Sequence, residues 1–352
     1  MRSPSLSQLQ PHPASGTPLE IGTLSRYLSC RRPLKPNLSL FSTEAETALQ
    51  VSISEACVRY AISSLSSIRE NFDRQGQDVD HSLPPAPNLD SSRNTRYALQ
   101  QYNAAIVTLS QKLSSATRES IYPTLICCQL FMSIELSQLN YSSAGLHFIR
   151  GLRIMQEYQV RPSVDEHGNF LPARNPNLPL VDAFAIKFFS TSVFYPKEQL
   201  AAMWAKTLLF EESSGYVVDE YERVSEILRR VHPQLVDIAN KTLNLLDDIM
   251  ILSCEDDIKP VLSRKACLLM RLREWYDNAQ VEMKGGENPI TIEGLIPKLM
   301  LYFYSAVKVI LMLALGCAWK IKEEVDAELE MMSRLLNRAS SDVPRDNEYW
   351  HD

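Results

Sequence analysis

Apolar residues recur every three or four positions along most of this chain, and this spacing limits the fold to packed helices. In the segment 95–114 the stripe runs without a gap through Leu99, Tyr102, Ile106, Leu109 and Leu113. Residues at these spacings share one face of an α-helix. No segment alternates clearly with a period of two, and only 11 of the 352 residues are glycine, which turn-rich sheets need in larger numbers. The sequence therefore predicts an all-α protein, built as an irregular array of antiparallel helices.

Residues 160–179 form the main internal break between the predicted helices. They contain four prolines and Gly168, a composition typical of a loop.

The break separates two blocks of predicted helices. A capping box at Thr43–Glu46 begins the first block, and serine at 142 or 143 is expected to cap its last helix. The first block has predicted helices over 55–68, 95–114, 124–139 and 142–158. The second block has predicted helices over 181–194, 197–211, 219–231, 234–252, 258–282, 291–319 and 322–339. In the helix over 258–282 the predicted apolar face is Leu262, Ala266, Leu269, Leu272 and Tyr276. We expect a helical domain over 41–340, with sub-blocks 41–159 and 180–340, and a flexible C-terminus over 341–352.

The first forty residues differ in composition from the rest. They are rich in Ser and Pro and carry five basic residues against the single acid Glu20, for a charge of +4. We predict a disordered basic tail over 1–40. Its run Cys30–Lys35 fits a weak nuclear import signal and a solvated linker equally well. The Arg/Ser bias also fits a mitochondrial transit peptide, but six prolines oppose the amphipathic helix that such a peptide needs.

Charge and cysteine content exclude several classes of protein. The chain has a formal charge of −6, so everything beyond the tail carries −10, whereas duplex binding usually rests on a basic patch. The seven cysteines are irregularly spaced, form no C-x-x-C pair, and follow no apolar leader. We therefore expect reduced thiols in an intracellular protein, without a zinc cage.

The most apolar segment is 299–319, which is long enough for a bilayer. Lys308 lies near its centre and would be costly in lipid, so we expect a buried core helix, with a tail anchor as the alternative.

Motifs that would indicate catalysis are mostly missing from the sequence. There is no phosphate-binding glycine loop, no G-x-S-x-G and no H-E-x-x-H, and the six histidines lie far apart. His147 is expected to be a half-buried, partnered histidine. Asp247 and Asp248 are similar to the aspartate-rich helix of isoprenoid-type all-α enzymes, but Ile251 replaces the third aspartate. We expect no enzyme, catalytic residue, metal ligand or cofactor. The alternatives are such an isoprenoid-type enzyme and a non-catalytic helical scaffold.

Several ordered segments resemble the regulatory domain of fungal zinc-binuclear-cluster transcription factors. The first is Val58–Ile68, VRYAISSLSSI, which is similar to the family's I/V-R-H-A-x-x-A-L-x-x-L. The segment Tyr97–Ile106, YALQQYNAAI, is similar to A-L-x-x-Y-N-x-A-I. Leu125–Glu135, LICCQLFMSIE, looks like L-x-C-x-L-F-x-x-x-E. Asn140–Met155 is similar to the closing helix, with His147 and Gly151 at its marked positions. The order and spacing agree over 44–158, and beyond that the resemblance is only to a helical chain.

The resemblance implies a transcription regulator that acts in the nucleus. In the family this domain is linked to effector sensing, autoinhibition and contacts with co-regulators, and many members belong to secondary-metabolite gene clusters. The family's DNA-binding unit is a six-cysteine zinc cluster, whereas this chain has only Cys30 before residue 57. Direct DNA binding is therefore not expected from this chain. We expect co-regulators or a DNA-binding partner, a small-molecule effector and no membrane. A groove lined by the helices 125–139 and 299–319 is the expected binding site. A truncated gene and a true cluster-less relative both fit this sequence.

Overall fold

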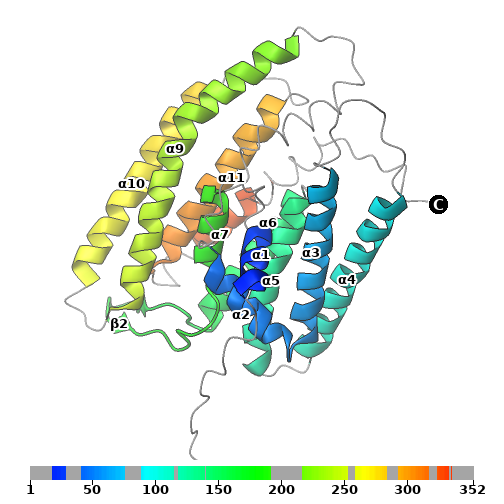
Figure 1. The fold of residues 1–352 in the computed structure, drawn as a ribbon. Coiled ribbons are helices and arrows are strands. Elements are labelled where there is room, and N and C mark those ends of the chain that lie inside the picture. The colour runs from blue at the N-terminus through cyan, green and yellow to red at the C-terminus, as the bar shows by residue number, and fades with distance from the viewer. Residues whose placement is uncertain are drawn as a thin grey trace, which may run out of the picture. The chain divides into compact units, whose positions relative to one another are not determined.

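The computed structural model describes residues 18–28, 41–75, 89–114, 118–138, 140–191, 216–252, 258–283, 292–316, 323–332 and 334. The chain divides into two compact units, Met1–Pro123 and Thr124–Asp352. Apart from one two-stranded hairpin, the regular elements in these ranges are helices, which confirms the all-α prediction (Figure 1). The division falls at 123/124 and not at the loop 160–179, where the sequence suggested a break.

The first unit contains α1 (Pro18–Leu28), α2 (Ser42–Ser52), α3 (Ala56–Gln75), α4 (Leu89–Ser114) and the short η1 (Arg118–Ser120). Its helix α1 lies inside the predicted disordered tail, so that prediction is wrong for 18–28. Leu24, Tyr27 and Leu28 are buried, which explains why this short segment is ordered. The rest of 1–40 lies outside the described residues.

Helices α3 and α4 pack side by side through small residues (Figure 1). Ala98 and Ala105 of α4 are buried, and the buried Ser64 of α3 donates a 2.9 Å hydrogen bond to the carbonyl of Ala98. The predicted apolar face of α4 is therefore rotated by about one residue. Of that stripe Leu109 is buried, whereas Leu99 and Ile106 are exposed. The reason is that two close helices are separated best by small side chains, which a search for large apolar residues overlooks.

The predicted helix starts were only partly right. Helix α2 begins after Phe41 with no side-chain cap, so the expected capping box does not form. Helix α6 (Tyr141–Glu157) is capped by Asn140, whose side chain accepts from the N–H of Ser143, and not by a serine. Asparagine is as good an N-cap as serine, and sequence alone did not separate adjacent candidates.

The second unit is built around two helices, α5 (Ile121–Ser137) and α11 (Ile292–Leu313), which are buried on nearly all sides over 121–137 and 300–313. In α5 every residue except Tyr122 is buried. Helix α7 (Val181–Thr191) joins α11 through an aromatic cluster, in which the ring of Phe189 lies 5.3 Å from Tyr302 and 5.4 Å from Phe303. These contacts fix the centre of the second unit.

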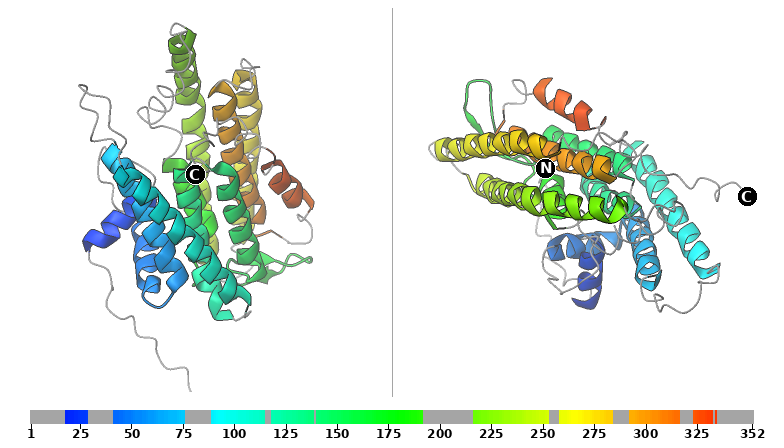
Figure 2. Two further views of the ribbon diagram at one scale, coloured as in Figure 1. Left: turned by 90° about the vertical axis from the view of Figure 1, so that its right-hand side faces the viewer. Right: turned by 90° about the horizontal axis from the view of Figure 1, so that it is seen from above.

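Two long helices, α9 (Tyr216–Met250) and α10 (Ile258–Met283), run alongside each other in this unit (Figure 2). The sequence predicted two helices, 219–231 and 234–252, on either side of Pro233. The structure has one helix that continues through Pro233, so the proline, although it removes one backbone hydrogen bond, does not end the helix. The helix predicted over 197–211 lies outside the described residues.

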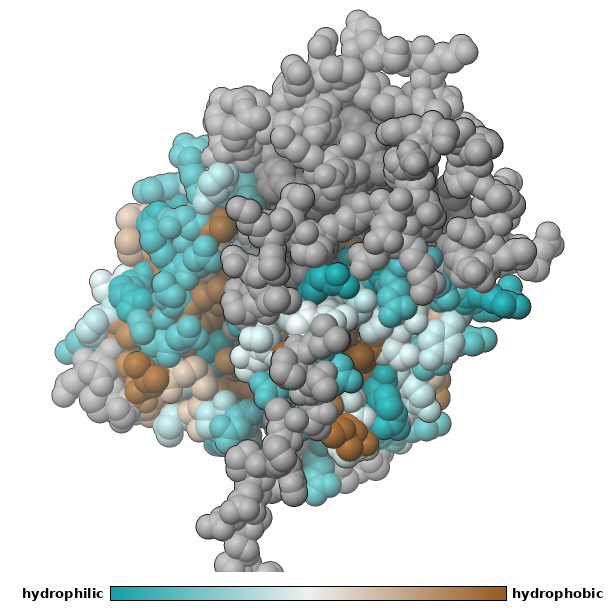
Figure 3. Space-filling model, in the orientation of Figure 1, coloured by the Kyte–Doolittle hydropathy of each residue, from teal (hydrophilic) through white to brown (hydrophobic). Residues whose placement is uncertain are grey.

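The buried face of α10 is also rotated from the predicted one. Leu272 is buried as predicted, but its buried neighbours are Val261, Leu268 and Trp275, and Leu262 is exposed. The opposite side of α10 is mostly hydrophilic, with scattered hydrophobic residues (Figure 3).

A small hairpin lies between α6 and α7, where the sequence predicted a loop without strands. Strand β1 (Ser163–Val164) pairs antiparallel with β2 (Phe170–Leu171). Two-residue strands are too short to show an alternating pattern, so they were not predicted from the sequence. Gly168 takes a left-handed φ of +88° at the hairpin tip, which favours glycine. The loop is tied back to α6, because Arg174 donates its N–H to the Gln159 carbonyl and Asn175 donates its side chain to the Tyr158 carbonyl.

The apolar segment 299–319 is a buried helix, as expected, but it ends early. Helix α11 stops at Leu313 because Leu315 adopts a left-handed φ of 49° and is itself buried. Within the described ranges, no helix has the length and apolar character needed to cross a bilayer.

Gly151 allows α6 and α7 to approach closely. A Cβ atom at this position would lie 2.8 Å from Cγ1 of Val181, which is fully buried and cannot swing away. Overpacking of this kind costs about 1–3 kcal/mol, and the better helix propensity of alanine returns about 1 kcal/mol. We expect Gly151→Ala to lower the free energy of unfolding by up to about 2 kcal/mol in urea titrations. Adding Val181→Ala should recover part of that loss, and a more stable Gly151→Ala variant would contradict the contact.

Candidate functional site

A cavity of about 530 Å³ lies within the second unit. It is enclosed by the last turns of α6, the segment 161–166, strand β2, the first turn of α7, the end of α9 and the end of α11. Its floor is apolar, since Leu152, Met155, Leu246 and Ile310 line it and are all buried. A volume between about 300 and 1,000 Å³, with an apolar lining and a few polar groups, is typical of small-molecule sites.

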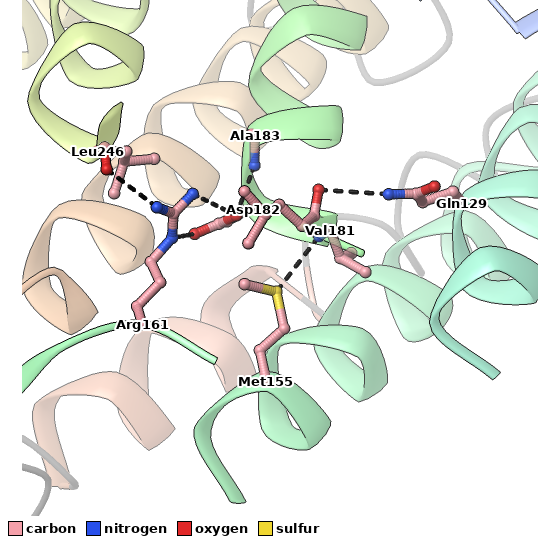
Figure 4. Close-up of polar contacts among 8 residues, drawn as sticks. Gln129, Met155, Arg161, Val181, Asp182, Ala183 and Leu246 are labelled. Carbon is pink, nitrogen blue, oxygen red and sulfur yellow. Dashed lines mark hydrogen bonds and ion pairs between the residues drawn. The ribbon is translucent and has the colours of Figure 1, made fainter. Parts of the chain in front are cut away.

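One buried ion pair holds three of these elements together (Figure 4). Arg161 donates from Nε and Nη2 to the two carboxylate oxygens of Asp182, at 2.5 and 3.0 Å, and from Nη1 to the carbonyl of Leu246 at 3.0 Å. The two side chains are only 11% and 6% exposed. Planar, bidentate pairing satisfies both charges without water. This pair therefore fixes the segment after α6 to the start of α7 and to α9.

The start of α7 uses its neighbours to satisfy its first N–H groups (Figure 4). Val181 donates to the sulfur of Met155, and Ala183 donates to Asp182 at 2.7 Å. Gln129 of α5 donates from its side chain to the carbonyl of Leu180 at 3.3 Å. The wall of the cavity is thus held by hydrogen bonds from helices distant in the sequence.

The hairpin tip brings a carboxylate to the rim of the cavity. Asp165 accepts hydrogen bonds from the backbone of His167 and Asn169 and from the side chain of Asn169. These bonds hold the pKa of Asp165 below its ordinary value, with Asn169 as the largest cause. Asp165 is partly exposed. Glu166 beside it is also exposed, so this rim carries negative charge.

A lysine on α10 holds the end of α11 that forms the other wall. The Nζ atom of Lys265 donates to the carbonyls of Met312, at 3.1 Å, and Ala314, at 2.7 Å. These are among the last carbonyls of the helix, which have no partner within it. Leu313 and Ala314 line the cavity, so Lys265 positions the wall from outside.

The stability of this end of α11 should depend on pH. Burial lowers the pKa of Lys265 to about 8, against about 10.4 in an unfolded chain. Between these values the unfolded chain holds a proton that the folded chain has lost, so the free energy of unfolding rises with pH. Below pH 8 both states are protonated and this rise is absent. We therefore compare the free energy of unfolding of the wild type with that of Lys265→Met by urea titration at two pH values. The wild type minus variant difference should be larger at pH 9.5 than at pH 7.5.

The exposed Lys259 of α10 provides the matched control, because Lys259→Met should keep the rise in stability with pH. An equal difference between wild type and Lys265→Met at both pH values would refute the lowered pKa.

One member of the aspartate pair considered from the sequence is engaged in an ion pair. Asp248 is paired with Arg264 of α10 at 2.5 Å, and both side chains are about half exposed. Within the described ranges, no group of three or more His, Cys, Asp or Glu side chains is placed to hold a metal ion. The pair Asp256–Asp257 lies outside those ranges.

His147 is half-buried as expected, with its ring 5.0 Å from that of Phe131. Burial and the nearby positive charge of Arg150 lower its pKa to about 4, so it is neutral near pH 7. Cys57, Cys127 and Cys128 are buried, reduced cysteines, and burial raises the pKa of Cys128 to about 12. Cys267 is free and exposed.

The cavity described above differs from the groove expected between two apolar helices. The end of α11 does line the cavity, through Ile310 and Leu313, but no residue of α5 does. Every residue of α5 except Tyr122 is buried, and the expected groove stays a prediction. The pairing of Arg161 with Asp182 was not predicted from the sequence. An arginine before a proline and an aspartate opening a helix are common, and nothing in the sequence links positions 21 residues apart.

One known protein is similar to nearly the whole chain. Over 323 residues the chain is 31% identical to transcription regulator lscL of Purpureocillium lilacinum, and the match covers 89% of this chain and 74% of that protein. No protein-family model matches the chain, and no solved structure does. A match of this length must include residues of both compact units.

Proposed function

The chain belongs to the family of fungal transcription regulators that includes lscL, and we propose that it controls transcription as a helical regulatory module without a zinc cluster of its own. The observation that carries the proposal is the similarity to a transcription regulator over 89% of the chain. The ordered motifs over 44–158 and the lack of a six-cysteine pattern support the finer assignment. Under this proposal the chain acts in the nucleus, is not an enzyme, and serves a secondary-metabolite gene cluster.

DNA contact comes from a partner protein in this proposal. The chain is acidic overall, at −6, and its surface is therefore poorly suited to collecting phosphates by charge alone. The cavity of the second unit is the place where a small-molecule effector acts, while co-regulators contact the helical surface. Because Arg161 joins three elements around the cavity, a ligand there can change how those elements pack.

A reporter assay tests this proposal directly. The chain is fused to a foreign DNA-binding domain and expressed with a reporter gene that carries the matching sites. We expect the fusion to change reporter output several-fold relative to the DNA-binding domain alone. The same fusion with Ile134→Asp, which we expect not to fold, should have no effect. An inactive wild-type fusion that is nuclear and well expressed would argue against a transcriptional role.

The alternative function, an isoprenoid-type enzyme, is tested by a separate experiment. Purified protein given magnesium and a prenyl diphosphate should show no turnover. Turnover that disappears in Asp247→Ala would replace the regulatory proposal with an enzymatic one.

A further inference from the structure

We propose that the cavity of the second unit binds a largely apolar small molecule that carries a positive charge, such as a hydrophobic amine, and discriminates against anions. The apolar body is set by the floor, where Leu152, Met155, Leu246 and Ile310 are each at most 6% exposed. Burial of apolar ligand surface on such a floor provides the main driving force for binding.

The sign of the ligand charge follows from which charged residues of the lining already have a partner of opposite charge. Among the described residues that line the cavity, Arg161 is the one cation, and all three of its nitrogens are engaged by Asp182 and Leu246. These contacts use three of the five guanidinium N–H groups, and Asp182 neutralises the positive charge, so an anionic ligand meets no uncompensated cation in this lining unless that buried pair is broken. Breaking a buried pair leaves an uncompensated charge, which is strongly unfavourable.

The rim favours a cation. Asp182 matches the charge of Arg161, and Asp165 and Glu166 add two formal negative charges to the lining. The hydrogen bonds from His167 and Asn169 hold Asp165 in place at the hairpin tip. A ligand whose apolar body lies on the floor can place an ammonium group near these carboxylates, where the attraction is partly screened by solvent. Gln156, Gln159 and Ser163 offer neutral hydrogen-bonding groups beside them.

The regulatory meaning of such a ligand rests on the proposed function, but its binding does not. Binding is measured on the purified chain, whereas the transcriptional role is measured with the reporter fusion. A failure of one therefore leaves the other to be judged separately.

The test uses three probes that share one ring and differ in charge: 2-(1-naphthyl)ethylamine, 2-(1-naphthyl)ethanol and 1-naphthylacetate. Dissociation constants are measured by calorimetry with the full chain at low salt. We expect the amine to bind at least tenfold more tightly than the acetate, with the alcohol between them. The ratio should shrink as salt is raised. Equal binding of amine and acetate, or no binding by the amine, would overturn the proposal.

Two variants with matched controls locate the binding. Glu166→Lys should reduce the amine-to-acetate ratio to about threefold or less, whereas Glu274→Lys, the same change on the exposed side of α10, should leave it unchanged. Gln156→Trp places a large ring at the mouth and should weaken all three probes at least fivefold. Gln111→Trp, on an exposed position of α4, should not. Both lining positions are exposed or at the rim, so these variants should fold, which circular dichroism will confirm. Loss of the amine preference in the control variants but not in Glu166→Lys would place binding elsewhere.

Discussion

Asp182→Ala should lower the free energy of unfolding by about 3–5 kcal/mol, which is the usual cost of removing one partner from a buried ion pair. The remaining guanidinium of Arg161 would be 11% exposed in the present packing and would keep only the Leu246 carbonyl as an acceptor. The N–H of Ala183 would also lose its acceptor at the start of α7. The change is measured by urea unfolding followed by circular dichroism.

The double variant Arg161→Met with Asp182→Leu distinguishes the loss of the whole ion pair from the cost of leaving one buried charge without its partner. Replacing both partners of a buried pair with apolar groups is often nearly neutral, so the double variant should be more stable than Asp182→Ala alone. Arg264→Ala is the matched control, because it breaks an ion pair of which both members are about half exposed. That change should cost about 1 kcal/mol or less. Equal losses for Asp182→Ala and Arg264→Ala would mean that Asp182 and Arg161 are not buried together.

Ile134→Asp and Leu311→Asp should each prevent the second unit from folding. Both side chains are fully buried, on α5 and α11 respectively. The substitution removes an apolar side chain that contributes about 2–5 kcal/mol and places a carboxylate where water cannot reach it. Together these costs approach the whole stability of a typical domain, about 5–15 kcal/mol. The expected result is a loss of helical circular dichroism and recovery only in the insoluble fraction.

Met270→Asp is the control for these two core variants, because Met270 of α10 is 56% exposed. It should change the stability by about 0.5 kcal/mol or less. A soluble, helical Ile134→Asp protein that had lost only its activity in the reporter assay would contradict a buried α5. It would instead favour the surface groove suggested by the sequence.

The fold class was predictable because it depends on local spacing. Steps of three and four residues identify helices wherever the apolar side chains are large, and the all-round apolar character of α5 and α11 marked them as central. The proline-rich composition of 160–179 likewise marked a connection between α6 and α7. Each of these signals is contained within a single segment.

Helix faces and boundaries were predicted less well. The buried face of α4 is centred on small residues, and that of α10 on large residues next to the predicted ones. Only Leu109 of α4 and Leu272 of α10 belong to both the predicted and the observed buried face. Which face is buried depends on how closely the next helix approaches, and that is a property of the partner as much as of the helix itself. The helix α1 was missed because its three buried apolar residues, Leu24, Tyr27 and Leu28, are too few to stand out in a Ser/Pro-rich context.

The sequence alone determined that the chain is helical, acidic beyond its first forty residues, and similar in its ordered motifs to a family of fungal regulators. Only the tertiary structure showed the cavity and its charge. Arg161, Asp182 and Leu246 come from three elements up to 85 residues apart, and Lys265 reaches α11 from α10. Pairing across such distances is decided by packing, since a buried charge is tolerated only where the fold brings its partner to it.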